Sequence, residues 1–161
     1  GREVSQASQK HRREGDVFED ALTKCIIGPS TVMMEADLFR ETGGFDENLE
    51  IAEDYEYWLR ITSRISVGYL HEILTVKRAG DWHQLSEKYG QIEIFRLRAL
   101  KGLVDRGFFP PERRALARAE LANKCRIYAA GCRKRGKNEE AAEYERLARE
   151  FRVDSILGID Q

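Results

Sequence analysis

The chain of 161 residues has little of what builds disulfide frameworks, metal clusters or membrane spans. Its three cysteines, Cys25, Cys125 and Cys132, are odd in number and lack the short spacing of zinc ligands. No apolar run is long enough to span a bilayer. We therefore expect reduced cysteines that pack as small apolar residues in a cytoplasmic protein, and whether it associates with a membrane is left open.

The chain also lacks an excess of charge, since its net charge is −1. The charge is unevenly distributed, with nine acids and one base, Arg40, from Glu35 to Glu56, and nine bases and two acids from Glu112 to Lys137. Three interpretations of the basic segment stay open: a solvated helix face, a partner of the acidic segment, and a peripheral contact with an anionic surface such as a membrane. It has no interleaved aromatics and no nucleic-acid motif, so we expect no nucleic-acid partner.

The most informative stretch is a glycine pair followed by an acidic helix start. Gly43–Gly44 allows a sharp turn and the close approach of another segment. Apolar residues recur with helical spacing from Tyr55 to Ile65, which places Glu53 and Asp54 at a helix N-terminus. A carboxylate there either balances the helix dipole or serves as a general base for a hydroxyl nucleophile.

A longer string of residues carries a resemblance to a known family. It consists of Cys25-Ile-Ile-Gly-Pro-Ser-Thr-Val-Met-Met34, Leu38-Phe39, Gly43-Gly44-Phe45-Asp46-Glu47, Glu53-Asp54-Tyr55-Glu56-Tyr57-Trp58-Leu59-Arg60, Val76-Lys77-Arg78 and Gln84-Leu85-Ser86. In order, spacing and residue type, this string resembles the acceptor half of a family 2 glycosyltransferase of the GT-A fold. The resemblance extends from about Lys10 to Gly107.

The resemblance implies an inverting sugar transfer from a nucleotide-diphosphate donor to a hydroxyl of a saccharide or lipid-linked saccharide. It implies that Asp54 is the catalytic base, with Glu53 beside it. It also implies substrate contacts from Gly43, Gly44, Trp58, Lys77, Arg78 and Gln84. Relatives carry a histidine that helps to hold the divalent metal, Mn²⁺ or Mg²⁺, or the donor diphosphate. Here Asp81 has that position and His83 follows two residues later. Whether Asp81 or His83 takes the metal, or both are loop residues without a chemical role, is left open.

The family's nucleotide-binding half, with its βαβ unit and Asp-x-Asp motif, has no counterpart in this sequence. The chain is therefore either a fragment of a longer glycosyltransferase or a domain that lost its donor site. We expect a fragment, which depends on a missing N-terminal half. Alone, the fragment is expected to hold no metal and to be inactive. The alternative is a helical protein-interaction module without catalysis.

The predicted fold class is α+β and predominantly helical. It comprises a partial GT-A half with two or three short strands over residues 1–86 and a C-terminal extension of three helices over residues 87–161. The expected strands are Thr31–Met34, Ser66–Tyr69 and Ile73–Arg78. The expected helices lie near Val17–Leu22, at Ala36–Thr42, from Glu53 to about Arg64, from Ser86 to just before Gly107, from near Glu112 to Arg135, and from Asn138 through Phe151. The last two weakly resemble a tetratricopeptide pair, and the residues from Asp154 are expected to be a tail.

Overall fold

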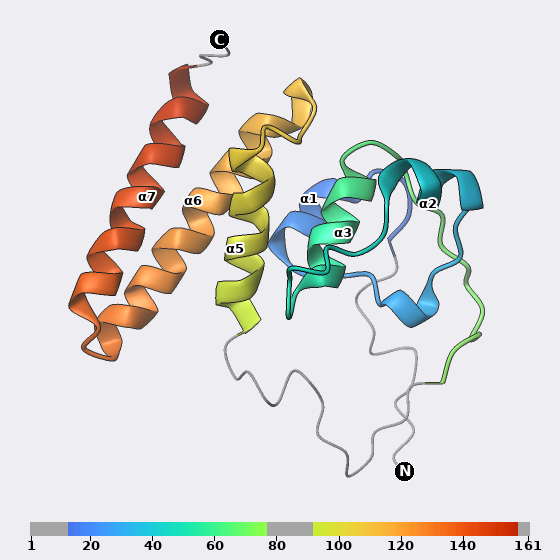
Figure 1. Ribbon diagram of the computed structural model, residues 1–161, viewed down its shortest axis with the longest axis horizontal. Helices are drawn as coiled ribbons and strands as arrows, with labels where there is room; N and C mark the ends of the chain where they lie inside the picture. Colours follow the sequence, from blue (N-terminus) through green and yellow to red (C-terminus); the bar gives the residue numbers. More distant parts are fainter. Residues whose placement is uncertain (1–12, 77–91, 158–161) are drawn as a thin grey trace.

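The computed structural model describes residues 13–76 and 92–157. Its α-helices are α1 (Phe18–Thr23), α2 (Ala36–Thr42), α3 (Glu53–Thr62), α5 (Ile92–Asp105), α6 (Pro111–Lys134) and α7 (Asn138–Leu157), and a 3-10 helix, η2, spans Pro29–Thr31. Figure 1 shows α7 at one end of the molecule, followed in space by α6, α5, α1 and α3, with α2 at the opposite end. Contacts between α6 and α7, α5 and α6, and α3 and α5 join them into one body.

The predicted α+β fold class is wrong for the described residues, which form helices and none of the two or three expected strands. The segment expected as strand Thr31–Met34 instead starts with the last residue of the 3-10 helix η2. The segment Ser66–Tyr69 makes a single β-bridge, in which the backbones of Gly15 and Val67 exchange N–H···O bonds of 2.7 and 2.9 Å. Ile73–Arg78 is irregular where it is described. An alternating apolar pattern forms a strand only where a second backbone runs beside it, and here that partner is limited to one residue.

The predicted helices are confirmed where they are described, and local sequence explains several of their ends. α2 ends at Gly43, whose φ of 71° lies in the left-handed half of the backbone map that favours glycine. α6 begins with Pro111 in its first turn, where the missing N–H of proline costs no hydrogen bond. α7 continues to Leu157, so part of the tail expected from Asp154 is helical.

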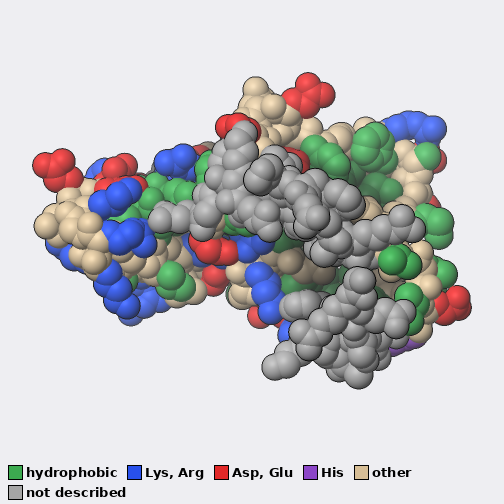
Figure 2. All heavy atoms as spheres, turned by 90° about the horizontal axis from the view of Figure 1, so that it is seen from below, with side chains coloured by type: hydrophobic (Ala, Val, Ile, Leu, Met, Phe, Trp, Pro, Cys, Tyr) green, Lys and Arg blue, Asp and Glu red, His purple; other side chains and the backbone are tan. Residues whose placement is uncertain are grey.

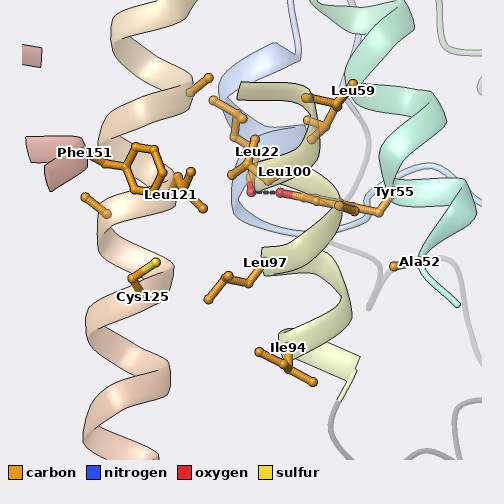
Figure 3. Packing of buried hydrophobic residues seen from close by; sticks show 14 of the residues in the cluster. Leu22, Ala52, Tyr55, Leu59, Ile94, Leu97, Leu100, Leu121, Cys125 and Phe151 are labelled. Atoms are coloured by element: carbon orange, nitrogen blue, oxygen red, sulfur yellow. Dashed lines mark hydrogen bonds between the residues drawn. The ribbon is translucent and has the colours of Figure 1, made fainter. Parts of the chain in front are cut away.

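One hydrophobic core joins the front of the chain to its C-terminal helices. Tyr55 of α3, Leu97 and Leu100 of α5, and Leu121 of α6 are all at most 1% exposed and belong to one cluster (Figure 3). In this view the Tyr55 side chain extends from α3 toward α1, where its hydroxyl donates a 2.6 Å hydrogen bond to the Leu22 carbonyl. Each large apolar side chain buried in this way contributes about 1.5–3 kcal/mol, so α3 depends on α5 and α6 for its stability.

A second, smaller cluster covers the opposite face of α3. Tyr57, Trp58 and Ile61 are buried there, packed against residues of the segments before α3. The prediction that Trp58 faces the interior is confirmed, since it is 5% exposed. Because both faces of α3 are covered, the short helix lies between two layers and its N-terminal turn is fixed from both sides.

The cysteines follow their predicted packing role. Cys125 and Cys132 are fully buried and Cys25 is half-buried, and all three are free thiols. Burial raises the pKa of the Cys125 thiol to about 11. Cys125 therefore remains protonated at neutral pH, and both cysteines of α6 serve as small core residues.

The surface differs between the two ends of the molecule. Figure 2 shows charged side chains over the end that holds α6 and α7, and hydrophobic side chains toward the end that holds α2. The large exposed apolar residues include Met33, Phe39 and Phe45. None of the helices in the described part of the chain combines the length and the apolar character needed to cross a membrane.

Candidate active site

The site is built on an abrupt helix start. Ala52, the residue before α3, has a φ of 67° and a ψ of 19°, a left-handed conformation that costs a non-glycine residue about 1–2 kcal/mol. Its side chain is buried in the main core, and this packing offsets the strain (Figure 3). α3 can therefore begin directly at Glu53, with Asp54 in the turn whose backbone N–H groups lack helical acceptors.

Asp54 is half-buried, and each of its carboxylate oxygens has a donor. Oδ1 accepts the backbone N–H of Tyr55 at 2.6 Å, and Oδ2 accepts the thiol of Cys25 with an Sγ–Oδ2 distance of 3.4 Å. The two donors come from different segments, so they restrict the carboxylate to one orientation. A carboxylate oriented in this way can accept a proton from a hydroxyl placed against its remaining lone pairs.

Cys25 is the site residue that sequence reasoning treated only as a packing residue. Burial raises the pKa of its thiol to about 12, and the negative charge of Asp54 and the hydrogen bond to it act in the same direction. Its Sγ also lies 3.5 Å from the Ile27 carbonyl oxygen, a second acceptor for the single S–H. A thiol with so high a pKa is protonated at neutral pH, so Cys25 acts as a donor rather than as a nucleophile.

Arg60 of α3 fixes the predicted substrate-binding turn, Gly43–Gly44, to the helix that carries the candidate base. Its Nη1 donates to the Thr42 carbonyl, and its Nη2 donates to the Gly44 carbonyl at 2.6 Å. Its Nε donates to Glu56 Oε2 at 2.9 Å, and the Arg60 side chain is only 12% exposed. The turn and α3 therefore form one structural unit.

Glu56 is a buried charge that connects this unit to the end of α5. It is 2% exposed, and while Oε2 pairs with Arg60, Oε1 accepts from Nη2 of Arg106 at 3.2 Å. Arg106, immediately after α5, also lies 4.0 Å from Asp46 Oδ2. A buried carboxylate is stable only when it is paired in this way. The network joins α3, the segment after the glycine turn, and the C-terminal helices.

Aromatic rings pack beside the same turn. The Phe45 ring centroid lies 5.0 Å from that of Tyr57 and 6.4 Å from that of Trp58. Trp58 Nε1 is buried and has no hydrogen-bond partner among the described residues. An unpaired buried N–H costs about 1–3 kcal/mol. Substrate contact by Trp58 therefore stays a prediction.

Several predicted site residues lie outside the described residues. These are the substrate-contact candidates Lys77, Arg78 and Gln84 and the metal candidates Asp81 and His83. Within the described ranges, 13–76 and 92–157, no group of three or more His, Cys, Asp or Glu side chains could hold a metal ion. The structure thus places Glu53 and Asp54 in the first turn of α3 and the Gly43–Gly44 turn against Arg60 in the last turn of the same helix. Their catalytic and binding roles stay predictions.

Comparison with known proteins finds a similarity to a protein of Rickettsia typhi that is named an uncharacterized glycosyltransferase. The two chains are 29% identical over 88 residues, which make up 54% of this chain and 28% of the relative. The chain thus matches little more than a quarter of that protein's length. No protein-family profile matches the chain. No solved structure matches it either.

Proposed function

We propose that this chain is the acceptor-side part of an inverting family 2 glycosyltransferase in which Asp54 is the catalytic base. The observation that carries the proposal is the oriented Asp54 carboxylate at the first turn of α3, bound by Tyr55 N–H and the Cys25 thiol. The similarity to a protein named a glycosyltransferase supports the general reaction class. The glycine turn fixed to the same helix supports the acceptor side in particular.

In the proposed reaction, the acceptor is a hydroxyl of a saccharide or a lipid-linked saccharide, bound over the Gly43–Gly44 turn. Asp54 takes the hydroxyl proton as the oxygen attacks the anomeric carbon of the donor sugar. The bond from that carbon to the nucleotide diphosphate breaks on the opposite face, and the nucleotide diphosphate leaves with its electron pair. Attack and departure on opposite faces invert the anomeric centre.

We assign donor binding to a nucleotide-binding part beyond this chain, since the relative extends well past the region that the two proteins share. A bound Mn²⁺ or Mg²⁺ would neutralise the charge of the departing diphosphate. Its candidate ligands, Asp81 and His83, lie outside the described residues. Under this proposal the chain alone transfers no sugar.

The test is sugar transfer by the complete protein with a panel of nucleotide-diphosphate sugars. Asp54→Asn removes the base and should lower turnover by about 10²-fold or more, with donor affinity nearly unchanged. Asp37→Asn is the matched control, because Asp37 is an aspartate on α2 whose side chain is 82% exposed. It should keep normal turnover.

Two results would contradict the proposal. Normal turnover by Asp54→Asn would exclude Asp54 as the base. A folded complete protein that neither transfers nor hydrolyses any nucleotide sugar would instead favour a helical interaction module.

A further inference from the structure

The contacts of Arg60 are specific to one conformation of the glycine turn. The carbonyl groups of Thr42 and Gly44 flank Gly43, and both accept hydrogen bonds from the same guanidinium. Gly43 has a φ of 71° and a ψ of 179°, which only glycine adopts readily. The carbonyls on either side of Gly43 both point at the planar guanidinium of Arg60. A different conformation of the turn would therefore lose at least one of these two hydrogen bonds. A lysine, with a single charged nitrogen, could not reproduce this geometry.

The guanidinium is itself fixed by groups that make no contact with the turn. Glu56 binds its Nε at 2.9 Å, and the guanidinium carbon lies 4.9 Å from the centroid of the Tyr57 ring. The second oxygen of Glu56 binds Arg106 from the end of α5. Arg60 is therefore oriented by contacts within α3 and, through Glu56, by Arg106 at the end of α5.

The same helix carries the candidate base. Asp54 and Arg60 are six residues apart on α3, a rise of about 9 Å along the helix axis. Because a helix is rigid over this length, Arg60 sets where the turn lies relative to the Asp54 carboxylate. An acceptor bound by the turn would then present its hydroxyl at a fixed place with respect to the base.

We propose that Arg60 is a positioning residue for the acceptor. It maintains the Gly43–Gly44 turn in the conformation that binds the acceptor. This inference rests on the proposed glycosyltransferase function. Arg60 acts through the turn and contacts neither substrate, so its loss weakens acceptor binding and leaves donor binding unchanged.

The kinetic test uses the complete protein with Arg60→Lys. This substitution keeps the positive charge and removes the two guanidinium nitrogens that bind the turn. The KM for the acceptor should rise about tenfold, while the KM for the donor stays unchanged and kcat changes far less. The matched control is Arg40→Lys, because Arg40 lies on α2 with a side chain that is 71% exposed. A merely structural role for Arg60 would lower the amount of active protein and would move neither KM.

A second measurement does not depend on activity. Hydrogen exchange of the backbone amides from Gly43 to Asp46 should be faster in Arg60→Lys than in the wild type, while exchange in α6 stays the same. Gly43→Ala disturbs the turn from its own side and should reproduce the acceptor-specific rise in KM.

Unchanged exchange in the turn, or an unchanged acceptor KM in a folded Arg60→Lys protein that still needs Asp54, would overturn this inference alone. If Asp54→Asn transfers sugar at the normal rate, the proposed function fails instead. The two failures are thereby distinguished.

Discussion

At the scale of single residues, the candidate site depends on contacts between side chains that are far apart in the sequence. The Cys25 thiol and the Asp54 carboxylate are 29 positions apart and meet at 3.4 Å. The position of Asp54 at a helix start could be predicted from the sequence, because an acidic pair before a helical apolar pattern marks such a start. The contact of Cys25 with this carboxylate could not be predicted, since a lone cysteine in an apolar stretch is typical of a residue that only packs in the core.

This pairing predicts how Cys25 reacts with iodoacetamide. Only the thiolate is alkylated, and the raised pKa of about 12 keeps that form scarce. Asp54→Asn removes a negative charge beside the sulfur, which lowers the thiol pKa. At a pH of about 9, alkylation of Cys25 should therefore become several-fold faster, as measured by mass spectrometry of the labelled peptides.

The buried Cys125 is the internal control for this experiment and should label at the same slow rate in both proteins. Equal labelling rates for Cys25 with and without the Asp54 carboxylate would show that the two groups do not interact.

At the scale of elements, helices were predicted well and strands were not. The helix Ala36–Thr42 and its stop at Gly43 follow from local signals, since helical hydrogen bonds join residues four apart. A strand at Ser66–Tyr69 depends on a distant backbone, and the described chain supplies only Gly15 opposite Val67. The i,i+4 spacing of Glu56 and Arg60 indicates an ion pair on one helix face. The attachment of Arg60 to the turn required the folded geometry.

Two glycine substitutions with opposite expected effects on the free energy of unfolding test the description of these elements. Gly43→Ala forces a side chain into a positive-φ conformation and should lower the free energy of unfolding by about 1–3 kcal/mol. Gly102→Ala lies within α5, where an added methyl group meets no atom within 4 Å, and should raise it by about 0.5–1 kcal/mol. Urea denaturation followed by circular dichroism measures both. A Gly43→Ala protein as stable as the wild type would be incompatible with the turn described here.

At the scale of the whole molecule, the front helices and the C-terminal helices share one core. Besides the apolar cluster, buried Lys124 of α6 donates a 2.8 Å hydrogen bond to the Thr23 carbonyl at the end of α1. The same amine lies 3.5 Å from Glu120 and 3.7 Å from Glu93 of α5. The contacts of Lys124 with Thr23 and Glu93 could not be predicted from the sequence, because helix periodicity identifies a buried face and not its partner.

The shared core predicts that damage in α6 destabilises α3. Leu121, fully buried, lies in the cluster that includes Tyr55, so Leu121→Ala should cost about 2–5 kcal/mol of unfolding free energy. Hydrogen exchange should accelerate in α3 and α7 together. Ile127→Ala is the matched control, because Ile127 of α6 is 64% exposed and its truncation should change stability by no more than about 0.5 kcal/mol. Unaltered exchange in α3 would mean that the two parts fold independently.

The most direct test of the central claim, that Asp54 is the base for sugar transfer, is a single-turnover measurement in the complete protein. With donor prebound and acceptor saturating, the rate reports the transfer step and not donor binding. The account predicts that Asp54→Asn slows this step by about 10²-fold or more, while Asp37→Asn matches the wild type. Equal single-turnover rates for Asp54→Asn and the wild type would contradict it.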